Sequence, residues 1–189
     1  MFFKSNESFT RSERGGLSIE AVFALPMLVW AITATFVFWD AFKTLNISQK
    51  ATYTVADMLS RLDDTESVDS DYMTSIHEIF DFLAGGSGDN ALRVTVVKLE
   101  NDPVSGAEQM CLVWSDAVNV PEYTDLTVIE DRLPTLALGE ELIVVETEQE
   151  WAPAFAVGLA SYRFREVALA RPRNTPQLKF EPVQPTTCS

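Results

Sequence analysis

The sequence predicts an α+β protein, with an N-terminal transmembrane helix extended into a long amphipathic helix that packs on a small antiparallel sheet of about four strands. Three observations lead to this prediction. Residues 21–39 carry no charge, residues 40–62 have helical apolar spacing without Gly or Pro, and the segments after residue 91 are rich in Val or alternate in polarity. We expect a leader at residues 1–15, a membrane segment at 16–39, one domain at 40–175 and a Pro-rich tail at 176–189.

The apolar segment has the length of a membrane span. As a helix, its residues would extend about 28 Å, close to the hydrocarbon thickness of a bilayer of about 30 Å. Pro26 is compatible with this, since membrane helices tolerate proline. Trp39 beside Asp40 is typical of a membrane boundary. Glu20 stands at the start of the span, where a carboxylate costs free energy and therefore indicates a function.

The residues around Glu20 resemble the start of type IV prepilin-like proteins, over Arg14-Gly15-Gly16-Leu17-Ser18-Ile19-Glu20. With the next residues, Ala21-Val22-Phe23-Ala24-Leu25-Pro26, the chain looks more like the TadE-like pseudopilins of tight-adherence (Tad/Flp) pilus systems. Ala21 stands where the small Flp-type pilins usually carry Tyr. A weaker resemblance lies at Ala168-Leu169-Ala170-Arg171-Pro172-Arg173, since these proteins often end their domain in such a strand.

The resemblance implies a processing site and an assembly residue. A prepilin peptidase would cut between Gly15 and Gly16, which makes Glu20 the fifth mature residue, whereas cleavage after Gly16 would make it the fourth. Glu20 of one subunit would pair with the new amino terminus of a neighbour, because two charges that are costly alone in a membrane offset each other together. The resemblance implies a minor pilin or pseudopilin whose partners are other pilin subunits, the pilus assembly machinery and the lipid bilayer.

Charge predicts the orientation. Lys4, Arg11 and Arg14 precede the span and only Lys43 and Lys50 follow it closely, so we expect a single-pass protein of the inner membrane with its N-terminus cytoplasmic and its domain periplasmic. Residues 40–189 hold 11 basic and 25 acidic residues, a net charge of −14. This balance argues against nucleic acid as a partner, because phosphate backbones select basic surfaces.

Alternatives remain for the N-terminus. It could be an ordinary signal anchor, or a signal peptide cleaved near the small residues at 31–35. In the first case the protein would be a single-span envelope protein whose acidic domain binds a ligand or partner, and it would have no need of Glu20.

Two helices are expected before the sheet. The first carries a stripe of Phe42, Leu45, Tyr53, Ala56, Leu59 and Leu62, although a separate helix joined at Asp40 would show the same spacing. The second presents Met73, Ile76, Ile79, Phe80 and Leu83 and ends at Gly85. The acidic residues between 63 and 71 lack the spacing of a calcium loop, so we interpret them as a solvated loop that ends in a helix cap.

Four strands are expected at residues 92–100, 109–115, 141–151 and 161–171, with a turn at 102–106. In the third strand, Glu146, Glu148 and Glu150 should lie on a solvated face. Residues 125–133 favour a short helix, and the tail should be an extended arm or disordered. Phe155, Val157 and Leu159 form an apolar patch that is either core or a surface for another subunit.

The candidate residues for chemistry are few. Cys111 and Cys188 could close a disulfide in an oxidising compartment, or could remain a buried and a free thiol. His77 is the only histidine, and we expect it on a helix surface. No metal-ligand spacing or nucleophile elbow accompanies it. The sequence therefore predicts no enzyme, no cofactor and no metal site.

Overall fold

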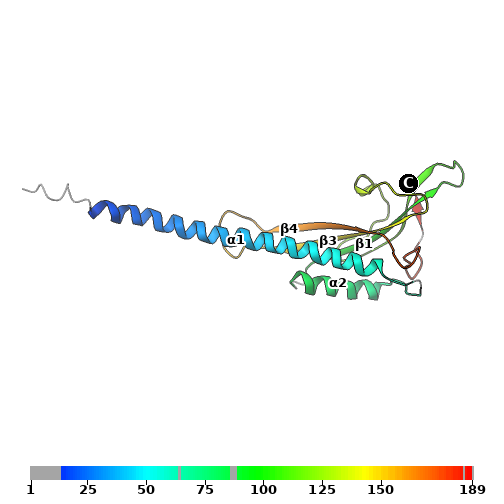
Figure 1. Ribbon diagram of the computed structural model, residues 1–189, viewed down its shortest axis with the longest axis horizontal. Helices are drawn as coiled ribbons and strands as arrows, with labels where there is room; N and C mark the ends of the chain where they lie inside the picture. Colours follow the sequence, from blue (N-terminus) through cyan, green and yellow to red (C-terminus); the bar gives the residue numbers. More distant parts are fainter. Residues whose placement is uncertain (1–13, 64, 86–88, 185, 189) are drawn as a thin grey trace, which may run out of the picture. The chain divides into compact units, whose positions relative to one another are not determined.

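The computed structural model describes residues 14–63, 65–85, 89–184 and 186–188, with side chains from residue 19 onward. Within these ranges it contains two α-helices, one 3-10 turn and a five-stranded antiparallel sheet (Figure 1), which confirms the predicted α+β class. The chain forms two compact units. The first holds the chain up to Phe42 together with Pro153–Ala160, and the second holds Lys43–Ala152 and Ser161–Ser189.

Helix α1 (Arg14–Ser60) is a single helix of 47 residues that runs through Pro26 and Asp40 without a break. The apolar segment therefore continues as one long helix and does not join a separate helix at Asp40. Beyond Phe42, its buried positions recur every three or four residues, at Ser48, Ala51, Thr52, Val55, Ala56 and Leu59. Phe42 and Tyr53, which were predicted to lie on the packed stripe, are exposed. The buried face uses smaller residues, among them Ser48, Ala51 and Thr52.

Helix α2 (Ser70–Ala84) has the ends that the sequence predicted. The Asp69 carboxylate accepts a hydrogen bond from the N–H of Tyr72 at 2.7 Å, and Gly85 follows the helix with a φ of +106°. An aspartate cap and a left-handed glycine satisfy the free backbone groups at helix ends. The buried face contains Met73, Ile76 and Phe80, as expected, and also His77. Ile79 and Leu83, which were predicted to lie on the same face, are exposed.

The sheet has the strand order β4-β3-β1-β2-β5, with every neighbouring pair antiparallel. Its strands are β1 (Ala91–Asn101), β2 (Glu108–Val118), β3 (Glu141–Trp151), β4 (Tyr162–Ala170) and β5 (Thr187–Cys188). The first four lie within one to three residues of their predicted bounds. The fifth was not predicted, because a two-residue strand in a Pro-rich tail leaves no periodicity to detect.

Each face of the sheet has its own core. On one face, Val55 and Leu59 of α1 and Ile76 and Phe80 of α2 cluster with strand residues that include Val94. On the other face, Leu126, Ile129 and Leu136 of the β2–β3 connection pack on Leu112, Leu142 and Val144. This connection was predicted to contain a helix at 125–133, and it forms only the 3-10 turn η1 (Glu130–Arg132). The Asp125 carboxylate accepts a hydrogen bond from the N–H of Thr127 at 3.0 Å, and such a local side-chain bond competes with helix formation.

The tail belongs to the fold. Leu178 and Phe180 are buried in the helix-side core, and the backbone of residues 179 and 181 bonds to Val68 on both sides. The indole N–H of Trp114 donates to the Leu178 carbonyl at 2.8 Å. The tail is therefore an extended arm that is packed along the domain. The Pro-rich sequence of the tail did not indicate these contacts.

Candidate functional site

The predicted processing site lies in the first turn of α1. Gly15 and Gly16 follow Arg14, the first described residue, whereas the rest of the expected leader lies outside the described residues. Gly16 precedes Glu20 by four residues, so in a helix both lie on the same face, one turn apart. The Glu20 side chain is exposed. Gly16 and Glu20 therefore belong to one stripe of the helix, on which the Glu20 carboxylate is open to solvent.

The helix after Glu20 is apolar on all sides. Most of its large side chains are exposed, among them Val22, Phe23, Leu25, Met27, Leu28, Val29, Trp30, Ile32, Phe36, Phe38 and Trp39. It is long and apolar enough to cross a membrane. The hydroxyl groups of Thr33 and Thr35 in this apolar segment donate hydrogen bonds to the backbone carbonyls of Val29 and Ala31, each at 2.8 Å. A helix that is apolar all round and internally satisfied requires lipid or other helices around it.

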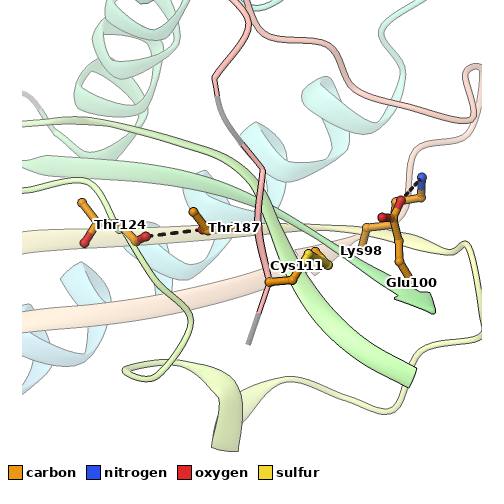
Figure 2. Close-up of a disulfide and its surroundings, with 6 residues drawn as sticks. Lys98, Glu100, Cys111, Thr124 and Thr187 are labelled. Atoms are coloured by element: carbon orange, nitrogen blue, oxygen red, sulfur yellow. Dashed lines mark hydrogen bonds and ion pairs between the residues drawn. A yellow bond between two sulfur atoms is a disulfide. The ribbon is translucent and has the colours of Figure 1, made fainter. Parts of the chain in front are cut away.

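The two cysteines are joined. Cys111 on β2 and Cys188 on β5 lie directly opposite each other in the antiparallel pair and form a disulfide (Figure 2). Nearby, the Thr187 hydroxyl donates to the Thr124 carbonyl at 3.4 Å, and Lys98 pairs with Glu100 at 2.7 Å. Of the two alternatives that the sequence left open, the structure has the bridge. It holds the tail against the sheet after the chain has returned from β4.

A buried carboxylate on another strand also fixes this tail. Glu141 on β3 accepts the N–H of Leu178 at 3.1 Å. Burial raises the pKa of Glu141, and the negative charge of Glu100 adds to this, while the Leu178 hydrogen bond and Lys98 act in the lowering direction. These residues line a cavity of about 310 Å³ between the sheet and the tail. The sequence analysis assigned Glu141 only to a strand and gave no signal of its burial.

A polar cluster on the outer face of the sheet was also missed. The Arg93 guanidinium on β1 lies 2.6 Å from the Glu146 carboxylate on β3, and both side chains are only 12% exposed. Arg93 also stacks on the Tyr123 ring at 3.7 Å and donates to the Tyr123 hydroxyl and the Pro121 carbonyl. Glu146 was predicted to be solvated, which is wrong, because the 119–140 connection folds over it. Burial raises the pKa of Tyr123, and Glu146 adds to this effect while Arg93 opposes it.

The other two glutamates of the predicted face are partly neutralised. Glu148 pairs with Arg163 and Arg165 of β4, and Glu150 pairs with Arg163. These exposed cross-strand pairs are worth little individually. Glu146, Glu148 and Glu150 of β3 are thus each paired with an arginine of a neighbouring strand. This pairing is a structural role.

The prediction for His77 was wrong. The side chain is buried, and its Nε2 lies 2.7 Å from the Asn90 carbonyl oxygen, a distance at which the ring donates its hydrogen to that oxygen. The Asn119 amide donates to the same carbonyl at 2.8 Å. His77 thus links α2 to the start of β1, because its position in the helix falls on the buried face beside Ile76 and Phe80. Because His77 is polar and stands among acidic residues in the sequence, its burial could not be predicted.

Among the described residues, no three His, Cys, Asp or Glu side chains lie close enough together to hold a metal ion. Comparison of the chain with family models, with characterised proteins and with solved structures gives no match. The candidate site is therefore defined by its own chemistry: an exposed carboxylate at the start of a long apolar helix, which carries a disulfide-closed acidic domain.

Proposed function

We propose that this protein is a pseudopilin or minor pilin that takes part in assembly of a tight-adherence (Flp-type) pilus after cleavage by a prepilin peptidase. The observation that carries the proposal is the position of Glu20 on α1. It lies one turn after Gly16, is exposed, and stands directly before the apolar segment in a single helix that continues into the domain. A plain membrane anchor needs the apolar segment but has no use for the carboxylate.

The physical role of Glu20 follows from its position. A carboxylate near the end of a span is costly unless a positive group is supplied. Cleavage before Gly16 creates an amino group, and a neighbouring helix can present that group to Glu20 as the apolar surfaces of the two helices pack. The pair then sets the register between subunits, while the exposed side chains from Val22 to Trp39 supply contact area.

The size of the domain supports a minor subunit. A slender major pilin would consist of little more than the helix, whereas here the second compact unit begins at Lys43 and contains the whole sheet. We place the protein in the inner membrane, with its N-terminus cytoplasmic and the disulfide-bonded domain on the oxidising side, where such bonds persist.

The test is the N-terminal sequence and intact mass of the protein extracted from membranes of cells with and without a prepilin peptidase. A start at Gly16 that requires the peptidase supports the proposal, and a start at Leu17 supports it with cleavage after Gly16. An intact Met1 in both cells would contradict it and leave a signal-anchored envelope protein. A start near residue 35 would show an exported protein without an anchor.

Assembly tests Glu20 separately from cleavage. Glu20→Ala should leave the cleavage site unchanged, so that the processed variant differs in mass from the processed wild type only by the Glu-to-Ala difference. It should abolish incorporation of the protein or its support of piliation. The matched control is Glu122→Ala, an exposed acid of the domain, which should have no effect. Equal piliation with both variants would contradict the assembly role.

A further inference from the structure

The loop between β3 and β4 is the longest uncharged segment outside the span. From Trp151 to Tyr162, the chain contains only apolar residues, one Ser, one Gly and one Pro. The rest of the second half of the chain is densely charged, and charges resume at Glu150 on one side and Arg163 on the other. An acidic soluble domain has no need of such a segment at its surface.

The placement of this loop is the second observation. Pro153–Ala160 forms one compact unit with the apolar part of α1, and in Figure 1 the connection that follows β3 passes beside that helix. Two residues of the span, Ala34 and Val37, are buried, whereas the large side chains around them are exposed. Residues three apart lie on one helical face, so Ala34 and Val37 mark a narrow buried strip on the span, within the same compact unit as the loop.

The depth of this strip fits a shallow insertion. Ala34 and Val37 precede the boundary residue Trp39 by five and two positions, which corresponds to about 7 Å and 3 Å along a helix. Interfacial segments bury their apolar side chains to about 5–10 Å. At that depth, water still reaches backbone groups that a loop leaves unpaired, whereas the centre of the bilayer would not permit them.

The exposed side of the loop is apolar. Phe155 is 60% exposed, and Ala154 and Ala156 beside it are also exposed. The ends of the loop carry aromatic residues that contact each other through Phe164, with ring centroids 6.4 Å from Trp151 and 5.2 Å from Tyr162. Tyr162 is 63% exposed, whereas Trp151 is buried. An exposed tyrosine at the end of an apolar segment is typical of the membrane–water interface.

We propose that residues 153–160 form a second membrane-contacting element, in which Phe155 enters the lipid of the leaflet that faces the domain. Lipid is the occupant that these observations favour, because the exposed surface of the loop continues the exposed apolar surface of the span in the same compact unit. The inference rests on the membrane anchoring in the proposed function. It assigns the chain a second point of contact with the membrane, in addition to the span.

The test is the accessibility of a nitroxide label in the full-length protein, reconstituted in phosphatidylethanolamine–phosphatidylglycerol vesicles with its disulfide intact. The label is attached at Phe155→Cys, and Ala156→Cys provides a second site. Val29→Cys in the span is the lipid reference, and Val104→Cys in the exposed β1–β2 turn is the water reference. We expect Phe155→Cys to show frequent collisions with oxygen and a loss of collisions with a water-soluble nickel complex, as at Val29→Cys.

The other outcomes overturn the proposal in distinguishable ways. If the nickel complex reaches the Phe155 label but not the Val29 label, the span is in the membrane and the loop is not. If it reaches both, the anchoring itself fails. If the Phe155 label is shielded from oxygen and nickel alike while Val29 remains in lipid, another protein surface, such as a second copy, covers the loop.

Discussion

Glu141 and Leu178 are joined by a hydrogen bond of 3.1 Å from the backbone N–H of Leu178 to a carboxylate that is only 4% exposed. This contact ties the first residue of β3 to a tail that starts after the last long strand. Together with the Cys111–Cys188 bridge and the burial of Phe180, it makes the tail part of the core. The stability of the domain should therefore respond to changes in this segment.

Glu141 should give the domain a pH-dependent stability. Burial is the main cause of its raised pKa, whose ordinary value is 4.5. The folded state thus retains a proton that the unfolded chain releases, so the contribution of Glu141 to the free energy of unfolding falls as pH rises from about 4.5 to the folded-state pKa. Glu141→Gln keeps an acceptor for the Leu178 N–H but does not titrate, so we expect it to remove this decline. The free energy of unfolding of the variant should therefore increase relative to that of the wild type as pH rises. Urea unfolding from pH 4 to 8 measures it, and parallel curves for the two proteins would contradict the prediction.

The disulfide should be a major source of stability. It closes a loop with a sequence separation of 77 residues, for which chain entropy predicts about 4 kcal/mol. Cys188→Ala removes the bridge at its exposed end and should lower the free energy of unfolding by roughly 2–5 kcal/mol. Chemical denaturation of the full-length protein in detergent measures this loss. Reduced wild-type protein is the control and should show the same loss, whereas an unchanged midpoint on reduction would contradict the prediction.

The Arg93–Glu146 pair should be costly to break. Arg93→Met leaves a mostly buried carboxylate whose remaining cationic partner is the more distant, exposed Arg132, besides the hydrogen bond from the Tyr123 hydroxyl, and we expect a loss of about 3 kcal/mol. The double variant Arg93→Met/Glu146→Met should lose less than the single one, because no unpaired charge remains. Arg61→Met, which breaks an exposed pair with Asp57, is the control and should cost less than about 1 kcal/mol. A double-mutant cycle in urea measures the coupling, and additive losses would refute it.

Helix α2 provides a matched pair of phenylalanines. Phe80 is fully buried in the helix-side core, and Phe82, two residues later, is 84% exposed. Phe80→Ala should destabilise the domain by roughly 3–5 kcal/mol, because a large cavity replaces the ring. Phe82→Ala should change stability by no more than about 0.5 kcal/mol. Thermal unfolding of both variants gives the comparison, and similar losses would show that another surface covers Phe82.

The sequence was informative where one periodicity governed a whole element. The uncharged run, the spacing of Met73, Ile76 and Phe80, and the Asp69 and Gly85 helix ends were each local patterns, so the helices were predicted with their ends nearly in place. The hairpin of β1 and β2 was equally local. These features depend on neighbours in the chain, which a single sequence displays.

The remaining features depend on distant partners. Glu146 appeared solvated because its strand alternates, and only the fold brings Arg93 and Tyr123 to it. The buried stripe of α1 includes Ser48 and Thr52, which are polar and were therefore not predicted to be buried. The hydroxyl groups of Thr52 and Thr147 of β3 form a hydrogen bond of 2.6 Å. In the tail, Leu178 and Phe180 carry no periodic signal. For the N-terminal site, the sequence supplied a motif, and the structure supplies the helical geometry around it.

The continuity of α1 has a mechanical consequence. The same run of backbone hydrogen bonds that starts before Glu20 ends at Ser60, where Val55 and Leu59 are embedded among the strands. Tension along this helix would be carried by its backbone hydrogen bonds to Val55 and Leu59. At the domain end, the load would fall on several buried side chains along one helix face, so the packing of the helix-side core would resist it.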